Sequence, residues 1–102
     1  MNSNVYKEGT DIMMYPYVKY SDGTEVLFSK IYIENGQECI DVHFERPSKN
    51  GFDSVRIKLP TYEVTVWEGN YTDEEINFFK QVVEHSSDLF YKYAKEGGLK
   101  FA

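Results

Sequence analysis

Four side chains that could do chemistry occupy every second position of one segment: Cys39, Asp41, His43 and Glu45. The positions between them hold the apolar residues Ile40, Val42 and Phe44. A β-strand sends successive side chains to opposite faces, so this alternation predicts a strand with its polar row on one face. Asp, His and Glu on one face could share a metal ion, and a Cys with a His could support nucleophilic catalysis.

The neighbours predicted for this polar row argue against both chemistries. A metal site needs a further ligand from an adjacent strand. The strand register derived below instead surrounds the row with cations and hydrocarbons, namely Val26, Phe28, Lys30, Arg56 and Lys58. The Cys and the His of the row are two pleats apart, which is too far for a hydrogen bond between them.

We therefore predict no catalytic residues, no metal site and no cofactor. The polar row is interpreted as the outer face of a sheet, with the cross-strand pairs Lys30–Asp41 and Glu45–Arg56 each worth at most about 1 kcal/mol. The alternative is a metal-dependent or enzymatic site built on Asp41, His43 and Glu45.

Composition indicates one acidic, globular domain. The chain has 102 residues, of which 41% are hydrophobic and 17% aromatic, as expected for a single packed domain. Its formal net charge of −6 opposes long-range attraction to nucleic acid or to an anionic membrane. The single cysteine, Cys39, permits no intrachain disulfide and favours a reducing compartment. No segment resembles a signal peptide or a membrane span, so we expect a cytoplasmic protein.

Dipeptides that favour tight turns divide the chain into strands. Asp22-Gly23, Asn35-Gly36 and Asn50-Gly51 each suit a two-residue type I′ hairpin turn, and Pro60-Thr61 suits a weaker turn. Two-residue turns at all four places would fix the register of every strand pair. The resulting pairs are apolar: Val18–Leu27, Leu27–Phe44, Phe44–Ile57, Val42–Leu59, Ile57–Val64 and Val55–Val66.

The last third of the chain predicts one helix. Thr72 and Glu75 have the spacing of a capping box, and Gly97-Gly98 supplies a C-terminal stop. Between them apolar residues recur at helical spacing, at Ile76, Phe79, Val83, Phe90 and Ala94. We predict an α+β fold, a five-strand antiparallel β-meander with one C-terminal α-helix packed on one face. It forms a single domain over residues 12–102, after a flexible N-terminal arm over residues 1–11.

In the predicted register the outer face of the sheet is rich in aromatic rings. We define the candidate interaction face as Tyr15, Tyr17, Phe28, Tyr32, Trp67, Lys30, His43 and Arg56; Met13, Lys19 and Lys58 share it. A half-solvated antiparallel sheet normally shows polar residues there, so rings on this face suggest that it is covered. The cover could be a protein partner, a second copy of the chain, or the arm and the Lys and Arg stems of the same chain.

We therefore predict a small non-enzymatic protein-interaction module that docks a protein partner, or forms a homodimer, through this face. A second alternative is that the same rings stack single-stranded nucleic acid, with flanking Lys and Arg contacting phosphates. The net charge of −6 opposes that alternative.

Overall fold

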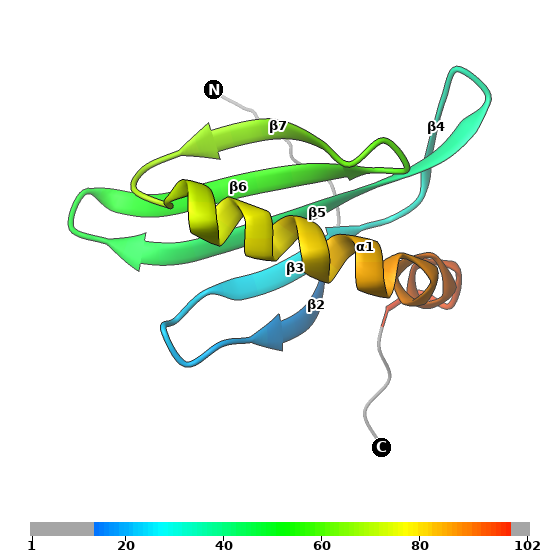
Figure 1. The fold of residues 1–102 in the computed structure, drawn as a ribbon. Coiled ribbons are helices and arrows are strands. Elements are labelled where there is room, and N and C mark those ends of the chain that lie inside the picture. The colour runs from blue at the N-terminus through cyan, green and yellow to red at the C-terminus, as the bar shows by residue number, and fades with distance from the viewer. Residues whose placement is uncertain (1–13, 99–102) are drawn as a thin grey trace, which may run out of the picture.

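The structure, a computed structural model, describes residues 14–98. Within this range it contains an antiparallel sheet of six strands and one helix (Figure 1). The elements are β2 (Met14–Lys19), β3 (Glu25–Ser29), β4 (Tyr32–Glu34), β5 (Gln37–Ser48), β6 (Gly51–Leu59), β7 (Glu63–Glu68) and α1 (Asp73–Lys95). The strand order is β2-β3-β5-β6-β7, and β4 pairs with β5 beyond the end of β3. The predicted α+β class and meander are confirmed, whereas the arm over residues 1–11 and Met13 lie outside the described residues.

The helix begins and ends where the sequence indicates. Thr72 is the N-cap: its Oγ1 accepts a hydrogen bond from the backbone N–H of Glu75 at 3.1 Å, and the Glu75 carboxylate accepts one from the N–H of Thr72 at 2.9 Å. This reciprocal pair satisfies two N–H groups that a helix start otherwise leaves free. At the other end the N–H of Gly98 donates to the carbonyl of Tyr93 at 2.7 Å, which closes the helix.

The core lies between the sheet and α1, which crosses one sheet face (Figure 1). At its centre the rings of Phe44 and Phe79 stack, with centroids 4.1 Å apart and planes 13° apart. Ile57 and Val83 are also fully buried in this core, and Val64 packs partly buried against it. Burial of this apolar face is the main force that holds α1 on the sheet.

The β4–β5 hairpin has the predicted turn. Asn35 and Gly36 both have positive φ angles, 52° and 78°, as a type I′ turn requires. Glu34 therefore lies opposite Gln37, and Tyr32 lies opposite Cys39.

The register changes by one residue between β4 and β3. Tyr32 lies opposite Cys39, so an unbroken strand would place Phe28 opposite His43; instead Phe28 lies opposite Val42. Because side chains alternate with a period of two, this change turns β3 over. The predicted pairing of β3 with β5 is therefore wrong by one residue.

The Ser29 side chain makes the irregularity possible. Its Oγ accepts a hydrogen bond from the backbone N–H of Asp41 at 2.9 Å and donates one to the carbonyl of Lys30 at 2.8 Å. The hydroxyl thus replaces a backbone partner at a place where the strand ladder is broken. As a result Phe28 turns toward α1, and Leu27 turns to the other face.

The β5–β6 hairpin turns one residue earlier than predicted. Ser48 lies opposite Gly51, so Lys49 and Asn50 are the turn residues. Phe44 consequently lies opposite Val55, two residues away from the predicted partner Ile57. A shift of two preserves the faces, so the predicted apolar side of β5 and β6 is still correct.

A register shift between β6 and β7 moves one further predicted residue to the other face. The predicted pair Ile57–Val64 is present, but the register then shifts and Trp67 lies opposite the buried Val55. Trp67 therefore lies on the helix side and not on the outer face.

The β2–β3 loop is longer than the predicted two-residue turn. The N–H of Gly23 donates to the carbonyl of Tyr20 at 3.0 Å, and Gly23 has a φ of 92°, which fits a type I turn followed by a bulge. Val18 then lies opposite Val26, and a second irregularity follows between Pro16 and Val18.

The buried helix face gives a test of the core. Phe79→Ala should lower the free energy of unfolding by about 3–5 kcal/mol, because it removes the ring stacked on Phe44 and leaves a cavity. Denaturant unfolding measures the loss, with Phe52→Ala as control because Phe52 is 63% exposed. A loss below about 1 kcal/mol for Phe79→Ala would contradict this packing.

The irregularity at Ser29 gives a second test. Ser29→Ala should cost about 1–3 kcal/mol, because the N–H of Asp41 loses its partner in a buried place. Ser54→Ala is the matched control, since Ser54 makes no side-chain hydrogen bond to any described residue. Equal unfolding midpoints for the two variants would show that the hydroxyl does not support the bulge.

Candidate functional site

Three rings of the predicted interaction face lie on the opposite side of the sheet. Phe28 is fully buried, and its ring centroid is 5.4 Å from that of Phe90 on α1. The Tyr15 and Tyr17 rings pack on Phe28 with centroids 5.4 and 6.3 Å away, and Tyr17 also lies 4.7 Å from Phe90. Their predicted outward position is wrong, because the register change at Ser29 turns β3, and with it β2, over.

The other aromatic members of the predicted face divide between the two sides. Trp67 lies on the helix side, 48% exposed, and its Nε1 donates a hydrogen bond to the carbonyl of Tyr71 at 3.1 Å. Tyr32 keeps its outer position, and its hydroxyl donates to the Asp41 carboxylate at 2.8 Å. Lys30 is exposed in the connection between β3 and β4. The outer face therefore has no continuous row of rings over residues 14–98.

The polar row of β5 has different partners from those predicted. His43 lies opposite Arg56 on one side and Leu27 on the other. Asp41 lies opposite Lys58, and not beside Lys30. On the same face Glu45 has Ser54 and Glu25 as neighbours, so the predicted pair with Arg56 is absent. Among residues 14–98, no group of three His, Cys, Asp or Glu side chains is placed to hold a metal ion.

Burial changes the acid–base properties of this row. Burial, followed by the positive charge of Arg56, lowers the pKa of His43 to about 4. Burial also raises the pKa of the Tyr32 hydroxyl, with its hydrogen bond to Asp41 as a second cause. His43 is therefore neutral at physiological pH. Cys39 is buried and its thiol lies 3.7 Å from the carbonyl of Gln37.

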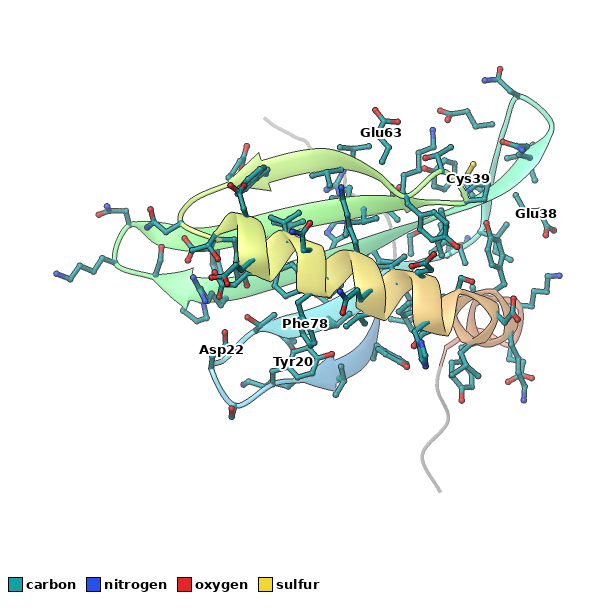
Figure 2. All side chains as sticks on the ribbon, viewed as in Figure 1. Tyr20, Asp22, Glu38, Cys39, Glu63 and Phe78 are labelled. Atoms are coloured by element: carbon teal, nitrogen blue, oxygen red, sulfur yellow. The ribbon has the colours of Figure 1, made fainter. Side chains whose placement is uncertain are left out.

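An open groove lies between α1 and the β2–β3 hairpin. Figure 2 shows Tyr20 and Phe78 close together between the hairpin and the helix. Their rings meet edge to face with centroids 5.8 Å apart. This ring pair stands where two pockets adjoin, of about 550 and 510 Å³. Each volume falls in the range of sites that bind small molecules or side chains.

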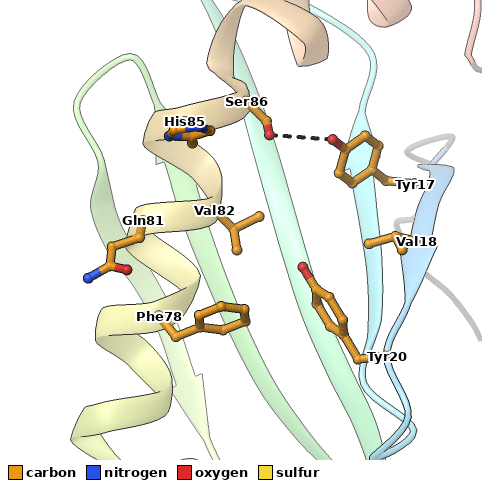
Figure 3. A pocket seen from close by; sticks show the side chains of 8 residues that line it. All are labelled: Tyr17, Val18, Tyr20, Phe78, Gln81, Val82, His85 and Ser86. Atoms are coloured by element: carbon orange, nitrogen blue, oxygen red, sulfur yellow. Dashed lines mark hydrogen bonds between the residues drawn. The ribbon is translucent and has the colours of Figure 1, made fainter.

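The first pocket is apolar with a polar margin. Its walls come from β2 on one side and from one face of α1 on the other (Figure 3). The lining residues are Tyr17, Val18, Tyr20, Phe78, Gln81, Val82, His85 and Ser86. The Tyr17 hydroxyl donates to the Ser86 hydroxyl across the pocket at 3.4 Å. Phe78 is 48% and Val18 38% exposed, so both present apolar surface to this pocket.

The second pocket continues the groove toward the helix N-terminus and is acidic. It is lined by Tyr20, Ser21, Asp22, Thr24, Thr72, Glu74, Glu75, Phe78 and Phe79. Burial, followed by the neighbouring Tyr17, raises the pKa of the Tyr20 hydroxyl, so this ring carries no charge at neutral pH.

Arg46 fixes the acidic end of the groove. Its Nε donates to the Asp53 carboxylate at 2.8 Å, and its Nη1 donates to Glu75 at 2.9 Å and Asp22 at 3.2 Å. The guanidinium also lies over the Tyr71 ring, 4.2 Å from its centroid. The hydrogen bond from Arg46 is the main cause that lowers the pKa of Asp53. One side chain thus joins β5, β6, the hairpin loop and the helix start.

Val18, Tyr20 and Phe78, which line the groove, were not predicted as site residues. One signal was present in the pair Phe78-Phe79. Consecutive helical residues are about 100° apart, so only one of two adjacent rings can face the core. The other ring had to point to solvent or to a second element.

Comparison with protein-family models, with curated proteins and with solved structures finds no match to this chain. Over residues 14–98, no helix is both long and apolar enough to cross a membrane.

The state of His43 gives a prediction of pH dependence. Its pKa is about 4 when folded and about 6.5 when unfolded, so the unfolded chain binds the proton first as the pH falls. The free energy of unfolding should therefore decrease between about pH 6.5 and pH 4, by up to about 3 kcal/mol in total. Below that range the lowered pKa values of Asp22 and Asp53 should remove further stability as these carboxylates are protonated.

Unfolding measured across pH in His43→Gln isolates the contribution of His43. The raised pKa of Glu45 acts in the opposite direction in both proteins, so it cancels in the difference between them. We expect the variant to lose much less stability than the parent between pH 6.5 and 4. His85→Gln, at an exposed position on α1, is the control. Parallel pH profiles for the parent and His43→Gln would contradict the assignment.

Proposed function

We propose that this protein is a non-enzymatic protein-interaction module that docks a partner in the groove between α1 and the β2–β3 hairpin. The observation that carries the proposal is the half-exposed ring of Phe78, which faces Tyr20 across the groove. Interfaces between proteins are enriched in Tyr and Phe at their centres, and hot spots are aromatic anchors in pockets. A protein partner and a cytoplasmic location both belong to this proposal.

The groove supports docking better than the outer sheet face does. Three rings of the candidate interaction face pack under or against α1, namely Tyr15, Tyr17 and Phe28. Few rings are therefore left on the outer side of the sheet for a partner to contact. The groove offers apolar surface from Val18 and Phe78 together with polar groups at its margin. Such a mixture can anchor an apolar side chain and fix its orientation.

The two alternatives from the sequence have less support. The Tyr32 hydroxyl already donates a hydrogen bond to the Asp41 carboxylate. Glu45 lies opposite Glu25 on β3, and no metal-ligating residue of another kind lies opposite it there. Nucleic acid would need stacking rings in a basic surface. Phe28 is buried instead, and the groove is acidic at one end.

Selection of peptides on the full chain tests the proposal. A phage library of random dodecamers is selected on the immobilised protein, and the enriched peptides are then synthesised. We expect binding that Phe78→Ser weakens by about tenfold or more, because truncation of a hot-spot ring costs about 2 kcal/mol or more.

Leu89→Ser is the matched control. Leu89 is on the same helix and is 40% exposed, but it lines neither pocket of the groove. Its variant should bind the selected peptides as the parent does. Peptides that bind Phe78→Ser and the parent equally, or no enriched peptides at all, would overturn the proposal.

A further inference from the structure

The two halves of the groove differ in charge. The half formed with β2 is lined by aromatic, aliphatic and neutral polar side chains, plus His85. The half at the helix start contains the carboxylates of Asp22, Glu74 and Glu75. A segment lying along the groove would therefore meet an apolar environment first and negative charge next.

Arg46 neutralises only part of this negative charge. It pairs with Asp22 and Glu75, as well as with Asp53 on β6. None of the described residues forms an ion pair with Glu74, which is exposed. Asp73, in the same first turn, adds a further negative charge close by. The acidic half thus keeps an excess of negative charge.

The spacing of Phe78 and Glu74 defines what could bridge the two halves. They are four residues apart on α1, which places them on one helix face about 6 Å apart along the axis. Residues two apart in an extended peptide are separated by about 6.6–6.8 Å. If an apolar side chain of such a peptide contacts Phe78, the peptide residue two positions further along therefore lies beside Glu74.

We infer that the groove binds an extended segment of a partner protein that carries an apolar or aromatic anchor followed, two residues away, by Arg or Lys. This inference rests on the proposed function, since it names the chemistry of the partner that docks there. Charge complementarity carries it: the basic side chain meets Glu74, and the anchor meets Phe78, Val18 and Tyr20. The net charge of −6 favours the encounter with a basic segment.

The test uses the random dodecamer library on the full chain, now with the sequences of the enriched peptides as the result. Peptides selected on the parent should carry Arg or Lys close to an aromatic or aliphatic residue. Selection on Glu74→Lys should replace this bias by Asp or Glu. Selection on Glu84→Lys should not, since Glu84 is also exposed on α1 but lines neither pocket.

One selected peptide then gives the magnitude. Replacing its Arg by Gln should weaken binding to the parent by about fivefold, the effect of an exposed ion pair worth about 1 kcal/mol. The same replacement should have little effect on binding to Glu74→Lys. Affinity for the Arg peptide should also fall as salt is added, because salt screens exposed charges.

The outcomes separate this inference from the proposed function. Peptides that depend on Phe78 but show no basic residue would overturn the inference and leave the docking groove in place. No enriched peptides would overturn both. A homodimer of the parent, measured by light scattering and lost in Phe78→Ser, would assign the groove to a second copy of the chain and would also overturn the inference.

Discussion

The broken ladder at Ser29 decides which side chains lie under the helix. A single helix can cover only one sheet face, so every strand must present its apolar residues to that face. In β3 this is achieved by a one-residue change of register, supported by the Ser29 hydroxyl between Asp41 and Lys30. Without it Phe28 would point away from α1. The contact of Phe28 with Phe90 would be lost, and the neighbouring rings of β2 would have no partner on the helix.

Arg46 then determines how the helix start sits against the sheet and the hairpin. Its three carboxylate partners come from the β2–β3 loop, β6 and α1. Breaking a partly buried network of this kind leaves charges without partners, which costs more than the network contributes on formation. The same bonds fix the distance between the two walls of the groove, since Asp22 stands on one wall and Glu75 on the other.

The sequence was sufficient for features that depend on local chemistry. The capping box at Thr72, the stop at Gly97-Gly98 and the Asn35-Gly36 turn are each encoded by a few adjacent residues. Bulges are not encoded by adjacent residues in this way. The residues around Ser29 have a composition that is ordinary for a strand, and Asp41, whose N–H donates to the Ser29 hydroxyl, is twelve residues away. One such bulge moves a whole strand to the other face. The assumption of strands without bulges therefore misplaced Tyr15, Tyr17, Phe28 and Trp67, and the groove, which needs the correct face of β2, was missed.

Side-chain hydrogen bonds also join the two walls of the groove. The Tyr17–Ser86 hydrogen bond joins β2 to α1, and the Arg46 pairs join the hairpin loop to the helix start. A partner that binds walls already held in place loses less free energy in ordering them. His43 lies on the opposite face of the sheet, opposite Arg56, and so does not touch the groove. Protonation of His43 in acid therefore lowers the stability of the fold from the face opposite the groove.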